Sequence, residues 1–193
     1  MRRLASVLLA LLLAASLAAC GNERQRPPAT PRAADPIGPF PADLSRYGMR
    51  FAHPANWPRE DPRPPHIAAV NSGQVSVNFW RYPRVERLPR TALELQRARR
   101  ALIAAAQARD RTMRLVRARV LRVNGFPAVE LVADERIGLV RRRVRSTHLY
   151  GYGAEFVVDA YAPPAEFARV DRSVFGPLLR SVRLQRPVAP RRP

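Results

Sequence analysis

The chain has 193 residues and a formal net charge of +19, with 34 basic residues against 15 acidic ones. Every basic residue is Arg, and a single Cys excludes a disulfide within the chain. In a cytosolic protein such a surplus of Arg would suggest nucleic acid as a partner. The N-terminal pattern predicts an extracytoplasmic protein, for which nucleic acid is not the expected partner.

The first 20 residues have the pattern of a lipoprotein signal. Arg2 and Arg3 precede an apolar run over residues 7–15, and small residues lead into Leu17-Ala18-Ala19-Cys20-Gly21. This run resembles the bacterial lipobox, in which a peptidase cuts before the Cys and the thiol carries diacylglycerol. It predicts a signal peptide over residues 1–19 and an extracytoplasmic protein anchored to a bacterial membrane by lipid at Cys20. A buried helix or a signal anchor is the alternative for the apolar run.

Two Pro-rich segments flank one predicted domain. Residues 20–46 contain six Pro and few apolar side chains, which predicts a lipidated Cys followed by an extended linker. Residues 185–193 form a second segment rich in Pro and Arg, predicted to be a disordered tail. Residues 47–184 are long enough for one domain with its own core, and carry 25 Arg against 12 acidic residues.

The first half of this domain predicts three strands and a helix. Residues 49–52 alternate in polarity and end at His53-Pro54. Residues 67–70 and 74–82 flank a turn at 71–73, which predicts a hairpin. Thr91 and Glu94 form a capping box before an amphipathic run, which predicts a helix over residues 92–108.

Two further hairpins follow. Asn124-Gly125 indicates a two-residue type I′ turn, which places Arg119 opposite Glu130 and Val120 opposite Val129. Residues 139–150 and 154–161 predict a second hairpin around a three-residue loop at 151–153. That loop places Val144 opposite Ala160 and Arg145 opposite Asp159.

A helix with a break at Gly176-Pro177 is expected to close the domain after Pro163-Pro164. Helices at separated points among antiparallel strands predict the α+β class. The local sequences resemble the PsbP/Mog1-like family, which includes envelope lipoproteins of the DcrB and LpqN kind. The resemblance rests on residues 47–54 with Trp57, on residues 123–129, and on a close formed by Ala162-Pro163, Phe167, Phe175 and residues 178–183.

The resemblance implies a single domain with an antiparallel sheet of about six to seven strands covered by two or three helices, as an α/β/α sandwich. It implies accessory or binding proteins without shared catalytic residues. The residues themselves agree. His53, His66 and His148 have no metal-binding spacing, and no Gly-x-Ser-x-Gly motif occurs. We therefore expect no catalytic residue, metal or cofactor, with His53 and His66 in loops and His148 as a hydrogen-bonded core residue.

The arginines form the most distinctive pattern. Alternation places the arginines of each of two predicted strands on one face of that strand. If these strands are neighbours, up to five arginines project from one face of the sheet, only partly neutralised by Glu130 and Asp159. The set is a candidate anion-binding site: Arg117, Arg119, Arg141, Arg143 and Arg145. The alternative is a solvated surface that reflects the composition of a GC-rich genome.

The sequence therefore predicts a non-catalytic, membrane-anchored envelope lipoprotein that binds an envelope protein or an anionic lipid or polymer. The alternative is a carrier of a small apolar or amphipathic ligand, with a cavity between sheet and helix lined by Phe79, Leu102, Phe156 and Phe175. Trp57, Trp80 and Tyr82 belong either to a ligand groove or to the core and loop anchors.

Overall fold

The computed structural model describes residues 29–36, 38 and 41–188. The predicted signal peptide and Cys20 lie outside these residues. The elements in chain order are β1 (Ala42–Leu44), η1 (Ser45–Tyr47), β2 (Met49–Phe51), β3 (Arg59–Glu60), β4 (His66–Ser72), β5 (Val75–Pro83), α2 (Ala92–Arg109), β6 (Arg114–Val123), β7 (Phe126–Ile137), β8 (Val140–Gly151), β9 (Ala154–Ala162), α3 (Pro164–Val170), η2 (Asp171–Phe175), α4 (Gly176–Ser181) and β10 (Arg183–Leu184).

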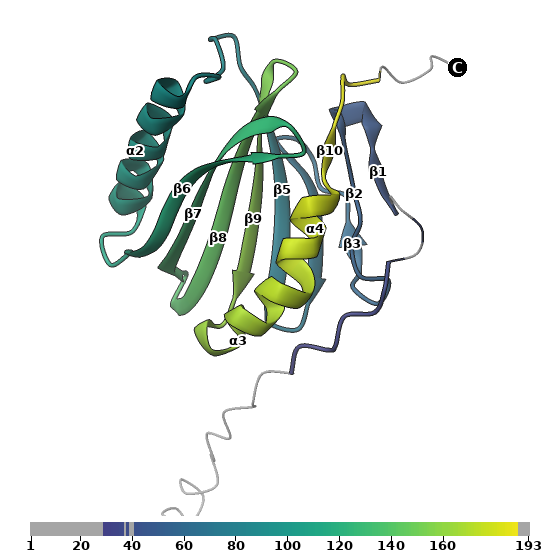
Figure 1. Cartoon of the computed structure of the whole chain (residues 1–193). Helices are drawn as coiled ribbons and strands as arrows, with labels where there is room; N and C mark the ends of the chain where they lie inside the picture. The colour runs from purple at the N-terminus through teal and green to yellow at the C-terminus, as the bar shows by residue number, and fades with distance from the viewer. Residues whose placement is uncertain (1–28, 37, 39–40, 189–193) are drawn as a thin grey trace, which may run out of the picture.

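A seven-stranded antiparallel sheet in the order β3-β4-β5-β9-β8-β7-β6 forms the centre of the molecule. Helix α2 packs on one face, against β6 and β7 (Figure 1). The C-terminal helices and a small sheet, β1-β2-β10, cover part of the other face. The predicted α+β class with helices on both faces is therefore confirmed.

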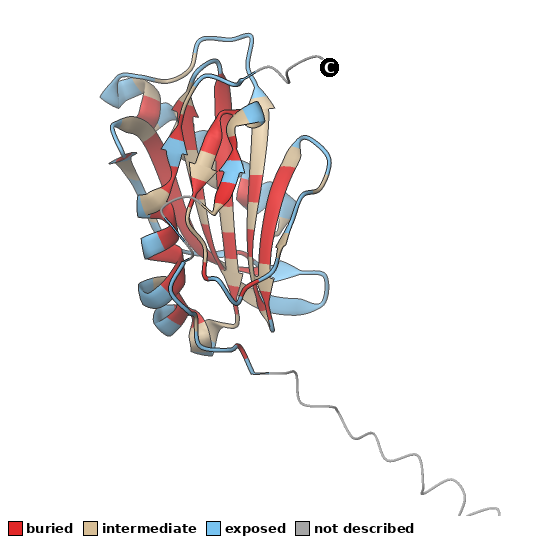
Figure 2. Ribbon diagram, turned by 90° about the vertical axis from the view of Figure 1, so that its right-hand side faces the viewer, coloured by how far each residue is buried: buried red, intermediate tan, exposed pale blue. Residues whose placement is uncertain are grey.

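The main core lies between the large sheet and the C-terminal layer. Phe51 of the small sheet stacks on Phe79 of β5 with ring centroids 3.9 Å apart, and Trp57 is also buried there. Figure 2 shows the buried residues along the strands, with exposed residues on the loops and the outward sides of helices. A smaller core under α2 contains Leu95 and Val129.

Helix α2 begins and ends as its sequence indicates. The Thr91 side chain accepts a hydrogen bond from the Glu94 backbone N–H, and the Glu94 carboxylate accepts one from the Thr91 N–H. This capping box satisfies two N–H groups that have no partner inside the helix. The helix ends at Arg109, one residue beyond the prediction.

The β6–β7 hairpin has the predicted register, with Arg119 opposite Glu130 and Val120 opposite Val129. Asn124 and Gly125 adopt φ of 48° and 86°, as a type I′ turn requires. Asn124 also makes a long-range contact. Its Nδ2 donates to the carbonyl oxygens of Arg180 (2.9 Å) and Val182 (2.6 Å) at the end of α4. The turn therefore fastens the sheet to the C-terminal helix.

The predicted register of the β8–β9 hairpin is wrong by one residue. The loop has two residues, Tyr152 and Gly153, with φ of 48° and 69°. Arg145 consequently lies opposite Ala160, and Val144 lies opposite Tyr161. Gly151 belongs to β8 rather than to the turn.

A long-range contact requires glycine at this position of the strand. A Cβ on Gly151 would lie 2.8 Å from the Phe126 ring, so this glycine makes room for an aromatic side chain on the neighbouring hairpin. The β4–β5 turn differs from the prediction in a smaller way. It is formed by Gly73 and Gln74; β4 is longer than expected, and β5 has the expected length but begins one residue later.

The C-terminal helix is interrupted where Gly176-Pro177 predicts a break. The interruption is a π-helical turn, η2, in which the Gly176 N–H donates to the Asp171 carbonyl five residues earlier. The wider turn accommodates Pro177, which has no N–H to donate. It also places the Asp171 side chain beside the sheet, where it contacts Arg145.

The folded unit is longer than residues 47–184. Ala42 and Leu44 of β1 are buried in the main core, and Thr30 is also buried. The Gln185 N–H donates to the Gly48 carbonyl oxygen, and the Val188 N–H donates to that of Ser45. Segments of the predicted linker, and Gln185 and Val188 of the predicted tail, therefore contact the domain.

Candidate anion-binding face

Each half of the large sheet has a helix layer on one side only. Helix α2 contacts β6 and β7, while α3 contacts β8 and β9 from the opposite side. The side that carries α3 and α4 is therefore open only over parts of β6, β7 and β8, away from the β6–β7 turn (Figure 1). We call this surface the arginine face, and its members are Arg117 and Arg119 on β6, Glu130 and Asp134 on β7, Arg141, Arg143 and Arg145 on β8, and Asp171 on η2.

Glu130 lies at the centre of the arginine face and is fully buried. Its Oε1 accepts hydrogen bonds from Nη2 of Arg117 (3.1 Å) and Nε of Arg119 (2.9 Å). Its Oε2 accepts one from Nε of Arg145 (2.8 Å). The side chains of Arg117 and Arg119 are 50% and 47% exposed. One buried carboxylate thus holds three guanidinium groups, two of which are open to solvent.

Two more ion pairs complete the face. Arg143 binds Asp134 with both Nε (2.7 Å) and Nη2 (2.8 Å). Arg145 donates from Nη1 to Asp171 at 2.7 Å, which links the sheet to the C-terminal helix. The expected neutralisation by Asp159 is wrong, because the one-residue shift in register places Asp159 on the opposite side of the sheet, opposite Ser146.

Glu130 and Asp134 remain ionised at neutral pH. Burial alone would raise the pKa of Glu130, but the charges and hydrogen bonds of Arg145 and Arg119 outweigh burial and hold that pKa below its usual range. The hydrogen bonds from Arg143 lower the pKa of Asp134. Five positive charges therefore face three negative ones, and the face keeps a net charge of +2.

The structure thus brings all five predicted arginines to one face. It does not give them equal roles. Arg145 is buried and structural, Arg143 is paired and half-buried, and Arg141 is exposed opposite Arg136. Arg117 and Arg119 combine exposure with fixed geometry, so they are the members best placed to meet an anion.

The opposite side of the sheet carries a polar network that the sequence did not predict. Nδ1 of His148 lies 2.7 Å from Oε1 of Glu155, and its Nε2 lies 3.1 Å from Oγ of Ser146. Ser146 donates to Asp159 at 2.5 Å. His148 is therefore hydrogen-bonded as expected, but it lines an open groove of about 430 Å³ rather than the core.

The order hydroxyl, imidazole, carboxylate is that of a hydrolytic triad. The setting differs, because Ser146 lies inside β8 between two strand partners. Those two ladders use the backbone N–H groups of β8, so the strand does not offer the donors of an oxyanion hole. The predicted three-residue loop would place Ser146 and Asp159 on different faces of the sheet, so the sequence did not predict this network.

The aromatic residues predicted to form either a ligand groove or core and loop anchors separate into two groups. Trp57 belongs to the core. Trp80 stacks on His66 with ring centroids 4.2 Å apart, and Tyr82 lies beyond it on the same open face. His66 is therefore the first residue of β4 rather than a loop residue, whereas His53 lies in a loop as expected.

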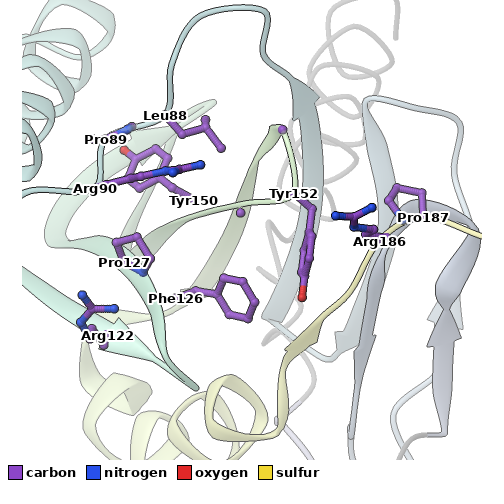
Figure 3. A pocket seen from close by; sticks show the side chains of 12 residues that line it. Leu88, Pro89, Arg90, Arg122, Phe126, Pro127, Tyr150, Tyr152, Arg186 and Pro187 are labelled. Atoms are coloured by element: carbon purple, nitrogen blue, oxygen red, sulfur yellow. The ribbon is translucent and has the colours of Figure 1, made fainter.

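A pocket of about 750 Å³ lies at the end of the sheet where the β6–β7 and β8–β9 turns meet the C-terminal segment (Figure 3). Phe126 and Tyr152 form an apolar pair in its wall, with ring centroids 5.4 Å apart. Its charged lining residues are all basic: Arg90, Arg122 and Arg186. This combination suits an anionic ligand with an apolar body.

The cavity expected for a carrier is not formed by the residues named for it. Phe79, Phe156 and Phe175 are packed in the main core, and Leu102 belongs to α2, on the other side of the sheet. The gap next to Phe175 holds only about 10 Å³. That volume is about the size of one water molecule.

Within the described residues, no group of three or more His, Cys, Asp or Glu side chains is arranged to hold a metal ion. No helix in this part of the chain has the length and apolarity needed to cross a membrane.

No protein-family model matches the chain, and no curated protein is detectably similar to it in sequence. Solved structures are similar in fold. Cyanobacterial PsbP (CyanoP) from Synechocystis, known as a solution structure, has 15% identity and a TM-score of 0.54, covering 86% of this chain and 97% of its own.

Two other structures are similar to a lesser degree. PA94 of Pseudomonas aeruginosa, a protein of unknown function described as a putative regulator, has 12% identity and a TM-score of 0.48, covering 75% of this chain and 92% of its own. LpqN of Mycobacterium tuberculosis, involved in cell envelope biogenesis, has 10% identity and a TM-score of 0.48, covering 71% and 83%. The fold of the chain is thus PsbP/Mog1-like, as its sequence predicts. At these identities the likeness concerns the fold alone.

Proposed function

We propose that the chain is a non-catalytic accessory protein of the bacterial envelope, anchored by lipid on Cys20, which binds an anionic partner through the arginine face. The partner presents phosphate or carboxylate groups, either on a polymer or on the surface of an envelope protein. The lipobox-like run supports the location, and the PsbP/Mog1-like fold is compatible with an accessory role.

The main support for the proposal is the geometry of Arg117 and Arg119. Arg117 and Arg119 are half-exposed while the carboxylate that orients them is fully buried. Each has five N–H donors and commits a single one to Glu130. Their guanidinium groups are therefore held in place before a ligand arrives, so binding costs less side-chain entropy than it would for free surface arginines.

Binding to soluble polyphosphate and to polyglutamate tests the proposal with the chain from Gly21 to Pro193, which contains every described residue. We expect salt-sensitive binding to at least one of them, because ions screen exposed charges beyond about 10 Å at 0.1 M salt. Replacing two exposed ion pairs in Arg117→Gln/Arg119→Gln should weaken affinity about tenfold, or about 1.4 kcal/mol. Fluorescence anisotropy with labelled polymer measures this change.

The matched control is Arg97→Gln/Arg100→Gln, which removes the same charge from exposed positions on α2. It should retain near-normal affinity. Equal losses in the two double variants would show that only net charge matters. An affinity that does not respond to salt would show that charge does not drive the binding. Either result would contradict the proposed site.

The pocket at the end of the sheet favours a second function, which is to carry an anionic ligand with an apolar body. Its three arginines have no acidic neighbour in the lining, and its wall contains Phe126 and Tyr152. Native mass spectrometry of the protein purified from its own envelope separates the two functions. A retained small molecule favours the carrier, and its absence favours the arginine face.

A further inference from the structure

The β7–β8 turn exposes three apolar side chains in a short stretch. Gly138 and Leu139 form the turn, flanked by Ile137 at the end of β7 and Val140 at the start of β8. Leu139 is 90% exposed, and its two apolar neighbours are about half exposed. Single exposed apolar residues are ordinary, but a group on a projecting turn marks a contact surface. We call residues 137–140 the apolar tip.

Arginines flank this tip, and their charges are not neutralised by paired carboxylates in the described part of the chain. Arg136 and Arg141 lie directly opposite each other across the hairpin. Like charges in this position are destabilising unless an anion lies between them. Neither forms a salt bridge with a carboxylate of the described residues. Their charges act at longer range, since hydrogen bonds and the charge of Arg136 lower the pKa of Asp110, and hydrogen bonds and the charge of Arg141 lower that of Asp134. Arg142 adds a third positive charge, and its Nη1 reaches Gln74 in the β4–β5 turn.

The tip lies at the end of the molecule where the N-terminal segment leaves it (Figure 1). Asn56 holds that segment on the domain, because its Oδ1 accepts from the Ala34 N–H and its Nδ2 donates to the Arg32 carbonyl, both at 2.8 Å. Residues 21–28 are thus what separates the domain from Cys20. They can span at most about 30 Å, which keeps this end of the domain close to an anchored lipid.

We propose that the apolar tip is a membrane-contact element, in which Leu139 and its apolar neighbours enter the interface of an anionic bilayer while Arg136, Arg141 and Arg142 bind lipid phosphates. The inference rests on the proposed lipid anchoring of the chain. An apolar tip surrounded by arginines is complementary to a bilayer surface with acyl chains below anionic head groups. This second contact would fix the orientation of the domain and engage Arg141 of the arginine face with lipid. It would leave Arg117 and Arg119 beside the membrane, accessible to a partner.

Site-specific fluorescence of the full-length lipidated chain in vesicles tests the inference. Leu139→Trp places a reporter at the tip, and Val85→Trp places one at a fully exposed apolar position at the opposite end of the sheet. Trp57 and Trp80 give the same background in both variants. With brominated lipids in anionic vesicles, we expect residue 139 to be quenched several-fold more than residue 85. Arg136→Gln/Arg141→Gln in the Leu139→Trp chain should reduce that quenching, whereas Arg97→Gln/Arg100→Gln should not.

Equal quenching at residues 139 and 85, or none at either, would overturn the membrane contact. That result would leave the arginine face untouched if polyphosphate binding by Arg117 and Arg119 persists. Conversely, quenching at residue 139 together with unchanged polymer binding in Arg117→Gln/Arg119→Gln would support the tip and contradict the arginine face. Chains that fail to float with vesicles would contradict the lipid anchoring and the tip contact together.

Discussion

Replacing Glu130 with Gln should destabilise the protein by about 3 kcal/mol. The amide keeps the size of the side chain but removes the negative charge that three guanidinium groups share, and an unpaired buried charge costs about 3 to 5 kcal/mol. We expect the lower value, because Arg117 and Arg119 can turn toward water while Arg145 cannot. Urea unfolding followed by circular dichroism measures the loss.

Glu86→Gln is the control, because Glu86 is exposed in the loop before α2. It should change stability by no more than about 0.5 kcal/mol. A loss below about 1 kcal/mol for Glu130→Gln would mean that the guanidinium groups are hydrated independently of Glu130. The arginine face would then lack its organising centre.

Asn124→Ala should also cost about 3 kcal/mol. An Ala at φ of 48° is strained by about 1 kcal/mol. The change also removes two hydrogen bonds to the end of α4, each worth about 1 kcal/mol. Thermal and urea unfolding measure the sum.

Asn124→Gly separates the two contributions. Glycine accepts the positive φ, so this variant should lose only the two hydrogen bonds, about 2 kcal/mol. If Ala and Gly at position 124 are equally stable, the turn conformation contributes nothing. If both variants match the unsubstituted chain, the contact between the turn and α4 does not stabilise the fold.

Local sequence predicted the elements whose geometry is locally determined. The turn at Asn124-Gly125 fixed the register of β6 and β7, and that register placed Arg119 against Glu130. Thr91 and Glu94 located the start of α2. Alternation grouped the arginines within each strand, because strand side chains alternate regardless of what packs on them. The common face of the five depends on the pairing of both strands with β7.

Contacts between distant segments decided the rest. Gly151 looks like a turn residue, yet it is the last residue of β8, where the Phe126 ring leaves no room for a Cβ. Because the loop has two residues rather than three, Asp159 lies on the opposite side of the sheet from the arginines and joins the network around His148. Asp171 reaches Arg145 only because a π-helical turn places it there. Strand β1 was not predicted because it lies in a Pro-rich segment, and its strand conformation depends on pairing with β2 rather than on its own composition.

The central claim is that anions bind at the arginine face. NMR of the arginine Nε–Hε groups during titration with polyphosphate tests it most directly. The account predicts saturable shifts at Arg117, Arg119 and Arg143, with little change at Arg97 and Arg100 on α2. Shifts spread evenly over all arginines, or confined to Arg90, Arg122 and Arg186 in the end pocket, would contradict it.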